Sequence, residues 1–349
     1  MGRKKAEETI EVSDDFSEVT KLITKDYGNV VISGDALFTR KRKIIPITPS
    51  LDYALGGGIP EGSWVVVTGL EKLGKTSMLL QAAQNAQQPE FGEKHVIYMD
   101  AEARLKEMNL NSYKRINRDK FHLVVSAKGQ NPLTSEDFLN IGIKYLKQYP
   151  ECFMIIDSVS ALCEKREREG GVGTETRGGS AKLVAQFVRD MAQVVNANDS
   201  IMCMVTHVMA NTSGKGAWYI EKTANELKYQ VDVKIKAVSK EIVFPNNDKE
   251  NKAIGQKINW LVEYNALGMS PNQQVQSFLR YGDGLDEVYD WIEFGISLGL
   301  ITVAEGGGWH TLNCHNDTKV QGRENLRHFL VENPESLNNL RTKVQELLS

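Results

Sequence analysis

Eight consecutive residues carry the clearest chemistry in this sequence of 349 residues. They fit the pattern GxxxxGK[ST] without a mismatch and are followed by Ser77: Gly69, Leu70, Glu71, Lys72, Leu73, Gly74, Lys75 and Thr76. In such a loop the glycines let backbone N–H groups surround phosphate oxygens, and the helix that begins there adds partial positive charge. Lys75 supplies a full charge for the β- and γ-phosphates, and the Thr76 hydroxyl is typical of a Mg²⁺ ligand. The loop predicts a nucleoside triphosphate site.

Acidic side chains follow two apolar runs that have the length of strands. Asp157 ends the run Phe153–Ile156, which is where such enzymes place the Mg²⁺ carboxylate. Asp100 and Glu102 follow the run Val96–Met99 and offer a carboxylate that could orient an attacking water. The alternative for this pair is an acidic strand end that is merely solvated.

The elements that must position these residues alternate between strand and helix. The expected strands are Trp64–Thr68, His95–Asp100, His122–Ser126, Phe153–Asp157, Ile201–Thr206 and Val231–Ala237, and the helices between them include Thr76–Gln88, Ser135–Gln148 and Ser180–Asn196. Nearly continuous apolar strands predict an α/β fold whose mostly parallel sheet is covered on both faces. Ile258–Glu263 and Val275–Arg280 should extend it, antiparallel. Three parts are expected: 1–43, 44–284 and a small α+β domain at 285–349.

The N-terminal part is too small to bury its own apolar stripe. A helix carrying Phe16, Val19, Leu22 and Ile23 should end near Gly28, and a short strand should follow at 29–32. Such a unit must dock on something larger. Its own chain's core and a neighbouring subunit are both open as docking partners.

Composition excludes several classes of protein. Hydrophobic residues make up 41% and charged residues 25%, which is globular and not disordered. No apolar stretch reaches the roughly 20 residues that span a bilayer, so no membrane partner is expected. The four cysteines form no CxxC motif and indicate a reducing compartment. The net charge of −3 favours no particular partner.

With these landmarks in order, the sequence resembles the RecA family of ATP-dependent DNA strand-exchange proteins. The matching segments are Leu55–Gly62, the phosphate loop, Asp100–Glu102, Ile155–Leu162, Thr223–Tyr229 and, past the core, Gly322–Asn325 and Asn333–Glu335. The resemblance implies a RecA-like P-loop ATPase core with ATP and Mg²⁺ as cofactors. Glu102 would then activate water, Asp157 would bind Mg²⁺, and His207 would sense the γ-phosphate. His at that position is similar to the phage UvsX group.

The resemblance also assigns DNA contacts to two loops, 164–179 and 208–222. The implied DNA-binding residues are Arg177, Lys182, Arg189, Lys215, Trp218, Tyr219, Lys222 and Asn225, and the implied subunit-interface residues are Lys228 and Tyr229. From charge alone, solvated loops would be favoured, because glutamates alternate with the arginines of the first loop. Basic residues of the last domain fit either a duplex-binding surface or a solvated helix face: Arg323, Arg327, Arg341 and Lys343.

Two departures from the family stand out. The family's Val-Lys-Asn-Lys segment, whose lysines reach the neighbour's ATP, reads Val262, Glu263, Tyr264 and Asn265 here. What replaces these lysines is open. The family's adenine-stacking ring also has no clear match, and Tyr113 is the candidate.

The resemblance implies an ATP-dependent recombinase that forms a helical filament on single-stranded DNA and pairs it with double-stranded DNA. Single-strand-binding and loader proteins are possible partners. The expected location is the cytoplasm, for either a bacterial protein or a phage protein in a bacterial host. The alternatives are a hexameric helicase with the same core and a DNA-binding mediator that does not hydrolyse ATP.

Trp218 provides a test of the second DNA loop. If its ring stacks on a base, Trp218→Ala should weaken single-strand binding by about 1–3 kcal/mol, and Trp218→Phe should retain most of the affinity. Fluorescence anisotropy with a labelled oligonucleotide measures this. An unchanged affinity in the alanine variant would exclude stacking.

Overall fold

The computed structural model describes residues 16–162, 179–210, 219–221, 225–245, 250–265, 268–306, 308–314 and 316–348. It divides into two compact units, one ending at Arg42 and one beginning at Lys43. No helix among these residues combines the length and the hydropathy needed to cross a membrane.

The part of the first unit that the structure describes, 16–42, contains two helices, α1 (Phe16–Tyr27) and α2 (Gly34–Thr39). The predicted first helix is confirmed. The strand predicted at 29–32 is wrong, since this stretch has no strand hydrogen bonds and α2 follows it. A strand requires a neighbour to pair with, and the side chains of Val30, Val31 and Ile32 are exposed. This run has the composition of a strand but no partner strand among the described residues.

The second unit is built on a nine-stranded sheet of order β13-β12-β11-β10-β3-β7-β6-β4-β5. The parallel strands are β3 (Trp64–Gly69), β4 (Val96–Asp100), β5 (Phe121–Val124), β6 (Phe153–Asp157), β7 (Ile201–Val205) and β10 (Val233–Val243). The antiparallel strands are β11 (Gly255–Asn265), β12 (Gln273–Arg280) and β13 (Gly284–Leu285). The predicted α/β fold and its antiparallel extension are confirmed.

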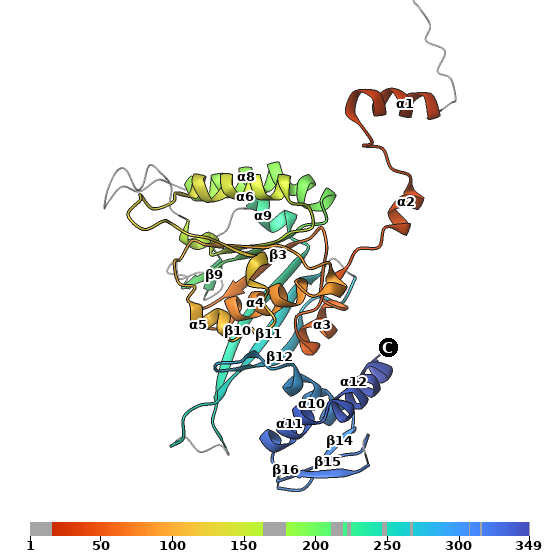
Figure 1. Ribbon diagram of the computed structural model, residues 1–349, viewed down its shortest axis with the longest axis vertical. Helices are drawn as coiled ribbons and strands as arrows, with labels where there is room; N and C mark the ends of the chain where they lie inside the picture. The colour runs from red at the N-terminus through yellow and green to blue at the C-terminus, as the bar shows by residue number, and fades with distance from the viewer. Residues whose placement is uncertain are drawn as a thin grey trace, which may run out of the picture. The chain divides into compact units, whose positions relative to one another are not determined.

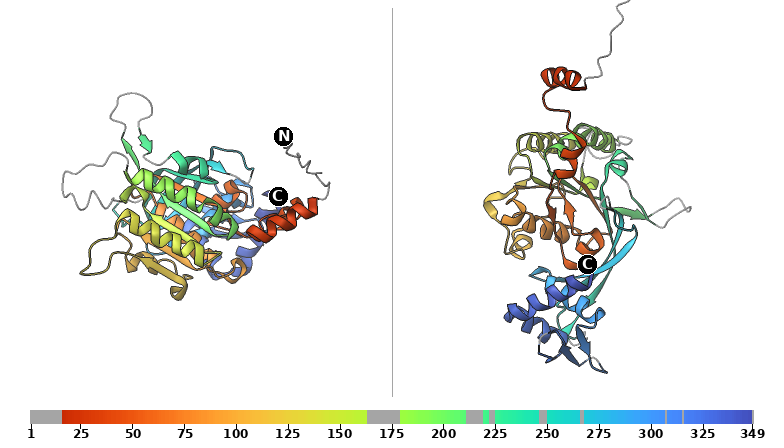
Figure 2. Two further views of the ribbon diagram at one scale, coloured as in Figure 1. Left: turned by 90° about the horizontal axis from the view of Figure 1, so that it is seen from above. Right: turned by 90° about the vertical axis from the view of Figure 1, so that its right-hand side faces the viewer.

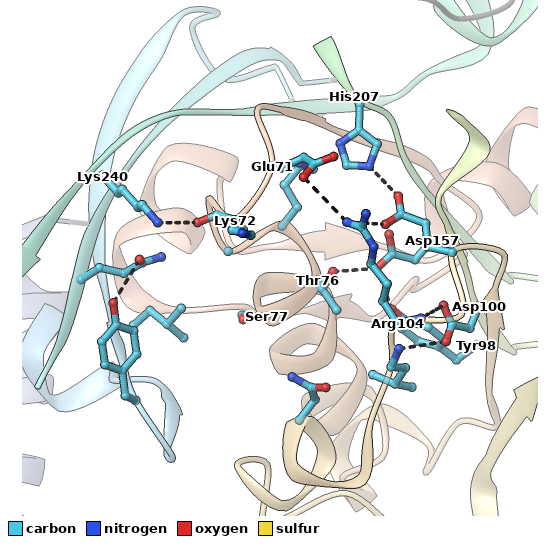
Figure 3. A pocket seen from close by; sticks show the side chains of 18 residues that line it. Glu71, Lys72, Thr76, Ser77, Tyr98, Asp100, Arg104, Asp157, His207 and Lys240 are labelled. Carbon is cyan, nitrogen blue, oxygen red and sulfur yellow. Dashed lines mark hydrogen bonds and ion pairs between the residues drawn. The ribbon is translucent and has the colours of Figure 1, made fainter. Parts of the chain in front are cut away.

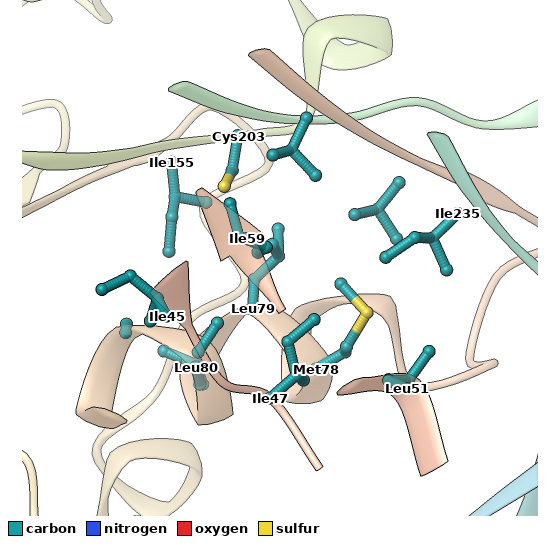
Figure 4. Packing of buried hydrophobic residues seen from close by; sticks show 14 of the residues in the cluster. Ile45, Ile47, Leu51, Ile59, Met78, Leu79, Leu80, Ile155, Cys203 and Ile235 are labelled. Carbon is teal, nitrogen blue, oxygen red and sulfur yellow. The ribbon is translucent and has the colours of Figure 1, made fainter. Parts of the chain in front are cut away.

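Helices cover both faces of this sheet. The helices α6 (Ser135–Gln148) and α8 (Gly179–Ala197) lie side by side on one face (Figures 1 and 2), where Phe138 and Phe187 pack on Met154. The helices α3 (Pro49–Leu55) and α4 (Lys75–Ala86) cover the other face. There Met78 and Leu79 pack against strand residues that include Ile155, Cys203 and Ile235 (Figure 4). Burial on both sides explains why the strands are apolar without alternation.

The chain after β13 forms a small α+β subdomain with its own hydrophobic core. It consists of α10 (Glu287–Ser297), β14 (Ile301–Val303), β15 (Trp309–Leu312), β16 (Thr318–Gln321), α11 (Arg323–Glu332) and α12 (Pro334–Leu348). The three strands are antiparallel. Ile292, Leu312, Leu326 and Leu340 are fully buried in its core. The predicted α+β composition of this segment is confirmed.

Three of the basic residues considered for duplex DNA are engaged within this part of the chain. Arg323 forms an ion pair with Glu293 at 2.6 Å, Arg327 pairs with Asp286, and the Arg341 guanidinium lies over the Trp291 ring. Lys343 is exposed. The arginines therefore stabilise the fold around α10. Neither a duplex-binding surface nor a solvated helix face, the two interpretations of these residues from sequence, predicts these contacts.

A buried acid joins α10 to α3. Asp290 is 1% exposed, and its Oδ2 accepts hydrogen bonds from the Ser50 hydroxyl (2.6 Å) and the Ser50 backbone N–H (3.2 Å). Burial raises the pKa of Asp290 from 3.8 to about 7, even though the Ser50 hydrogen bonds favour the ionised form. The folded chain therefore holds this proton at pH values where the unfolded chain has lost it.

The free energy of unfolding should consequently fall as pH rises from about 4 to about 7. Below this range Asp290 is protonated in both states, and above it folding must bury a charge. Asp290→Asn cannot ionise, so its free energy of unfolding should fall less over the same range. Urea unfolding near pH 5 and near pH 8 measures both slopes, with Asp119→Asn at an exposed position as the control. Equal slopes in wild type and Asp290→Asn would contradict the assignment.

Candidate nucleotide-binding site

The phosphate loop lies between β3 and α4, as its sequence predicts. Gly69 and Gly74 have φ values of 138° and 80°. A Cβ atom on Gly69 would lie 2.4 Å from the Ala237 carbonyl oxygen, and one on Gly74 would lie 2.4 Å from the Ile258 side chain. Lys72 between them also has a positive φ of 58°. Both glycines are therefore required by backbone conformation and by the closeness of β10 and β11.

Lys75 is buried under this loop. Its Nζ donates to the carbonyl oxygens of Leu70 (2.7 Å) and Gly69 (3.0 Å), and the residue is only 5% exposed. Burial lowers the pKa of Lys75, while the carboxylates of Asp157, Glu102 and Glu71 act in the opposite direction. A buried ammonium held by loop carbonyls is placed to exchange one of them for a phosphate oxygen.

Three more side chains meet at the start of α4. Asp157 Oδ2 accepts hydrogen bonds from the Thr76 hydroxyl and the Tyr98 hydroxyl, each at 2.6 Å. Burial raises the pKa of Asp157. Among the described residues no group of three His, Cys, Asp or Glu could hold a metal ion. One carboxylate and one hydroxyl fit Mg²⁺, which is usually held by few protein oxygens together with phosphates and waters.

Glu102 connects the ends of three neighbouring strands. Its Oε1 accepts from the Ser158 hydroxyl and lies beside His207 Nε2, both at 2.6 Å. The His207 backbone N–H donates to the Ser160 hydroxyl at 3.0 Å. Burial alone would raise the pKa of Glu102, but the hydrogen bonds from Ser158 and His207 and the nearby Arg104 outweigh it, and the pKa is lowered. Glu102 is thus held as a carboxylate.

These residues line one cavity of about 550 Å³ (Figure 3). It brings together the predicted Glu71, Lys72, Gly74, Lys75, Thr76, Ser77, Glu102, Asp157 and His207. It also contains residues that sequence reasoning missed, among them Arg104, Asn109, Lys240, Gln256 and Tyr281. Asn109 and Arg104 lie close to Glu102 in the sequence. Lys240, Gln256 and Tyr281 come from β10, β11 and the end of β12, and nothing local in the sequence links them to the loop.

Tyr113, the candidate for the adenine-stacking ring, is almost fully buried. Its ring is 4% exposed and lies against Gly284, and its hydroxyl donates to the Ser77 carbonyl at 2.8 Å. Tyr281 is 49% exposed and lines the cavity. Tyr113 therefore supports the start of α4, and Tyr281 offers the accessible ring.

The predicted DNA contacts are described only in part. Arg177, Lys215, Trp218 and Lys222 lie outside the described residues, as does the side chain of Tyr219. The short strands β8 (Val208–Ala210) and β9 (Tyr219–Glu221) pair antiparallel directly after His207. Lys182 and Arg189 are exposed on α8, and Arg189 forms an ion pair with Glu226 at 2.9 Å. Asn225 begins α9 (Asn225–Gln230).

The segment 262–265, where the resemblance implies lysines, has other contacts. Glu263 pairs with Lys234 at 3.0 Å, and the Asn265 side chain donates to the Leu55 carbonyl at 2.8 Å. Tyr264 is 50% exposed. On α9, Tyr229 is 89% exposed, and Lys228 is also exposed. Two exposed tyrosines thus stand near the predicted subunit contacts.

Comparison with known proteins identifies the family. Residues 15–286, most of the chain, match the RecA N-terminal domain. The chain belongs to the RecA family. It is 30% identical to protein RecA of Nocardioides over 327 residues, covering 92% of this chain and 87% of that protein. It is 28% identical to protein RecA of Helicobacter hepaticus over 350 residues, covering 99% and 94%. It is 30% identical to protein RecA of Mycobacterium marinum over 335 residues, covering 93% and 90%.

As a member of this family the chain is a RecA-type DNA recombinase and a DNA-dependent ATPase. The cavity described above is the candidate nucleotide site, because in open α/β sheets ligands collect at the carboxyl ends of the parallel strands.

Glu102→Gln tests the role of the carboxylate. The amide keeps the shape and can still accept from Ser158, but it cannot take a proton from water. We expect hydrolysis to slow by about 10²–10⁴-fold while ATP affinity changes little. Phosphate release and equilibrium binding of ATP measure the two quantities. A large loss of nucleotide affinity would instead indicate that Glu102 is a ligand.

Proposed function

We propose that the chain assembles as a helical filament on single-stranded DNA with ATP and Mg²⁺, tests double-stranded DNA for pairing, and exchanges strands. In this proposal hydrolysis returns the filament to a state that releases DNA. Thr76 and Asp157 hold Mg²⁺, which neutralises charge on the phosphates when it is bound. Lys75 and the loop amides bind the β- and γ-phosphates.

The contact between His207 and Glu102 carries this proposal. Glu102 Oε1 lies 2.6 Å from His207 Nε2, and β8 starts at the next residue, Val208. A γ-phosphate that repels the Glu102 carboxylate therefore changes the hydrogen-bond partner of His207, the residue directly before the second DNA loop. Nucleotide and DNA binding are linked in this way, and each strengthens the other.

The DNA surface that we propose includes one face of α8. Lys182, Gln186 and Arg189 are all exposed and follow the spacing of a single helix face. Lys182 and Arg189 can contact phosphates, and Arg189 would exchange Glu226 for a phosphate oxygen. With Asn225 and the loop residues Arg177, Lys215, Trp218, Tyr219 and Lys222, they form the proposed interface.

We infer that the filament forms through the first unit and an edge strand of a neighbouring copy. Val30–Ile32 is an exposed β-branched run without a partner strand among the described residues. The edge strand β5 is followed by exposed Val125 and itself exposes Leu123. Unpaired edges readily add another strand. Tyr229 and Lys228 on α9 are proposed as a second contact between subunits.

His207 further supports a phage-type, UvsX-like member of the family acting in the bacterial cytoplasm, where single-strand-binding and loader proteins are the expected partners. Tyr281 is the proposed adenine contact, since its ring is exposed at the mouth of the cavity.

The proposal predicts DNA-stimulated hydrolysis by helical particles. ATPase rates with and without single-stranded DNA, followed by electron microscopy of the same samples, test it. We expect faster hydrolysis and helical filaments when DNA is present, and loss of hydrolysis in Lys75→Ala, which lacks the phosphate-binding ammonium. Rings would indicate a helicase, and assembly without hydrolysis would indicate a mediator. An unchanged rate with no assembly would contradict the proposal.

A further inference from the structure

The cavity contains an arginine, Arg104, from outside the phosphate loop. Glu263, Tyr264 and Asn265 bring no positive charge toward a neighbour's nucleotide. Phosphoryl transfer nevertheless develops charge on the γ-phosphate oxygens, and a cation beyond the loop lysine usually stabilises it. We propose that Arg104 supplies this charge from the same subunit, as a catalytic residue that contacts the γ-phosphate. This inference rests on the proposed ATP site.

Arg104 is placed by a rigid turn after β4. Its backbone N–H donates to Asp100 Oδ1 at 3.2 Å, and the N–H of Leu105 donates to Asp100 Oδ2 at 2.9 Å. Ala103 has a positive φ of 54°, so the turn is tight. The base of the side chain is therefore fixed, while the side chain itself is 64% exposed and free to rearrange.

Two carboxylates hold the guanidinium across the mouth of the cavity. Arg104 Nη1 lies 3.2 Å from Glu102 Oε2 and 3.8 Å from Glu71 Oε2 (Figure 3). Glu71 belongs to the phosphate loop, and Glu102 is the proposed water-activating group. A cation between these two residues lies beside the position of the γ-phosphate. Phosphate oxygens match the planar guanidinium fork, so a bound triphosphate can replace either carboxylate.

This exchange of partners has a consequence for Glu102. While Arg104 and His207 both hold it, its oxygens are engaged; when the guanidinium moves to the γ-phosphate, Oε2 becomes available to a water molecule. The water oxygen then bonds to the γ-phosphorus as the bond to the β–γ bridging oxygen breaks, and that oxygen leaves on ADP with the bonding electrons. One water proton passes to Glu102 and the other remains on the phosphate. Arg104 donates hydrogen bonds throughout and transfers no proton.

Lys240 is the other cation that reaches this cavity from outside the phosphate loop, and its contact is of a different kind. Its Nζ donates to the Lys72 backbone carbonyl at 3.0 Å, on the β10 side of the loop (Figure 3). Lys72 has a positive φ, so Lys240 supports a strained loop residue. Among the contacts of the described residues, Arg104 contacts Glu102, and neither Lys72 nor Lys240 does.

The test compares Arg104→Ala and Arg104→Lys with Arg118→Ala, an exposed arginine elsewhere on the surface. At saturating ATP with single-stranded DNA, we expect Arg104→Ala to lower the hydrolysis rate by about 10³-fold, the low end for such arginines because the side chain is exposed. Arg104→Lys should recover part of the rate, and added guanidinium ion should partly rescue the alanine variant. Arg118→Ala should match wild type.

A second measurement separates catalysis from ground-state binding. ADP has no γ-phosphate, so Arg104→Ala should bind it within about fivefold of wild type, the range expected for losing an exposed ion pair. Aluminium fluoride bound beside ADP imitates the phosphoryl group during transfer. In Arg104→Ala the affinity for ADP with aluminium fluoride should therefore fall together with the hydrolysis rate. Unchanged ADP affinity also shows that the variant is folded.

Three results would overturn the inference. The first is a wild-type hydrolysis rate in Arg104→Ala. The second is a faster rate in this variant, which would mean that Arg104 only restrains Glu102. The third is an equal loss of affinity for ADP and for ADP with aluminium fluoride. Lys75→Ala separates these from failure of the proposed site. If Lys75→Ala is inactive and Arg104→Ala is not, only the arginine's role is wrong; if Lys75→Ala still hydrolyses ATP, the site itself is wrong.

Discussion

The pairing of Glu102 with His207 is the interaction on which the organisation of this protein depends. The strand order places β6 between β4 and β7, so a side chain after β4 must reach past the end of β6 to contact one after β7. Ser158 fills that gap by donating to the same Glu102 oxygen that faces His207. The contact exists only because parallel strands end at a common edge. It places the start of the β8–β9 hairpin one hydrogen bond away from a carboxylate that lines the cavity.

The same edge creates an electrostatic problem. Asp100, Glu102 and Asp157 converge there, and Glu71 approaches from the phosphate loop. Each of the three strand-end acids has its own donors: two backbone N–H groups for Asp100, two hydroxyls for Asp157, and Ser158 with His207 for Glu102. Burial, together with the carboxylates of Glu102 and Asp100, still raises the pKa of Asp157. The nearby cations of Lys75 and Arg104 offset part of this concentration of carboxylates, and the proposed Mg²⁺ ion would offset more of it.

Much of this was readable in the sequence because the signals are local. The phosphate loop is a continuous motif, and Asp157 and Glu102 follow apolar runs that are buried on both faces. The burial of Tyr113 and the exposure of Tyr281 could not be predicted, because ring exposure depends on how β12 and the turn at Gly284 pack, which no local pattern encodes. Val30–Ile32 has strand composition, yet pairing requires a partner that the described chain does not supply. Arg104 was missed since one arginine after an acidic strand end has no distinctive spacing.

The substituted segment in β11 and the arginine after β4 have a common consequence. When the charge that stabilises γ-phosphate transfer comes from a neighbour, hydrolysis is completed only by assembly. If Arg104 supplies this charge from the same subunit, while Glu263 is bound to Lys234 in its own chain, the charge no longer requires the neighbour. In the proposed mechanism assembly would then act on hydrolysis through the DNA loop and His207, and DNA would be the principal signal that the site receives. If exposed Tyr229 and Tyr264 form the proposed subunit contact, it would rest on apolar and aromatic burial, which is less sensitive to salt than ion pairs are.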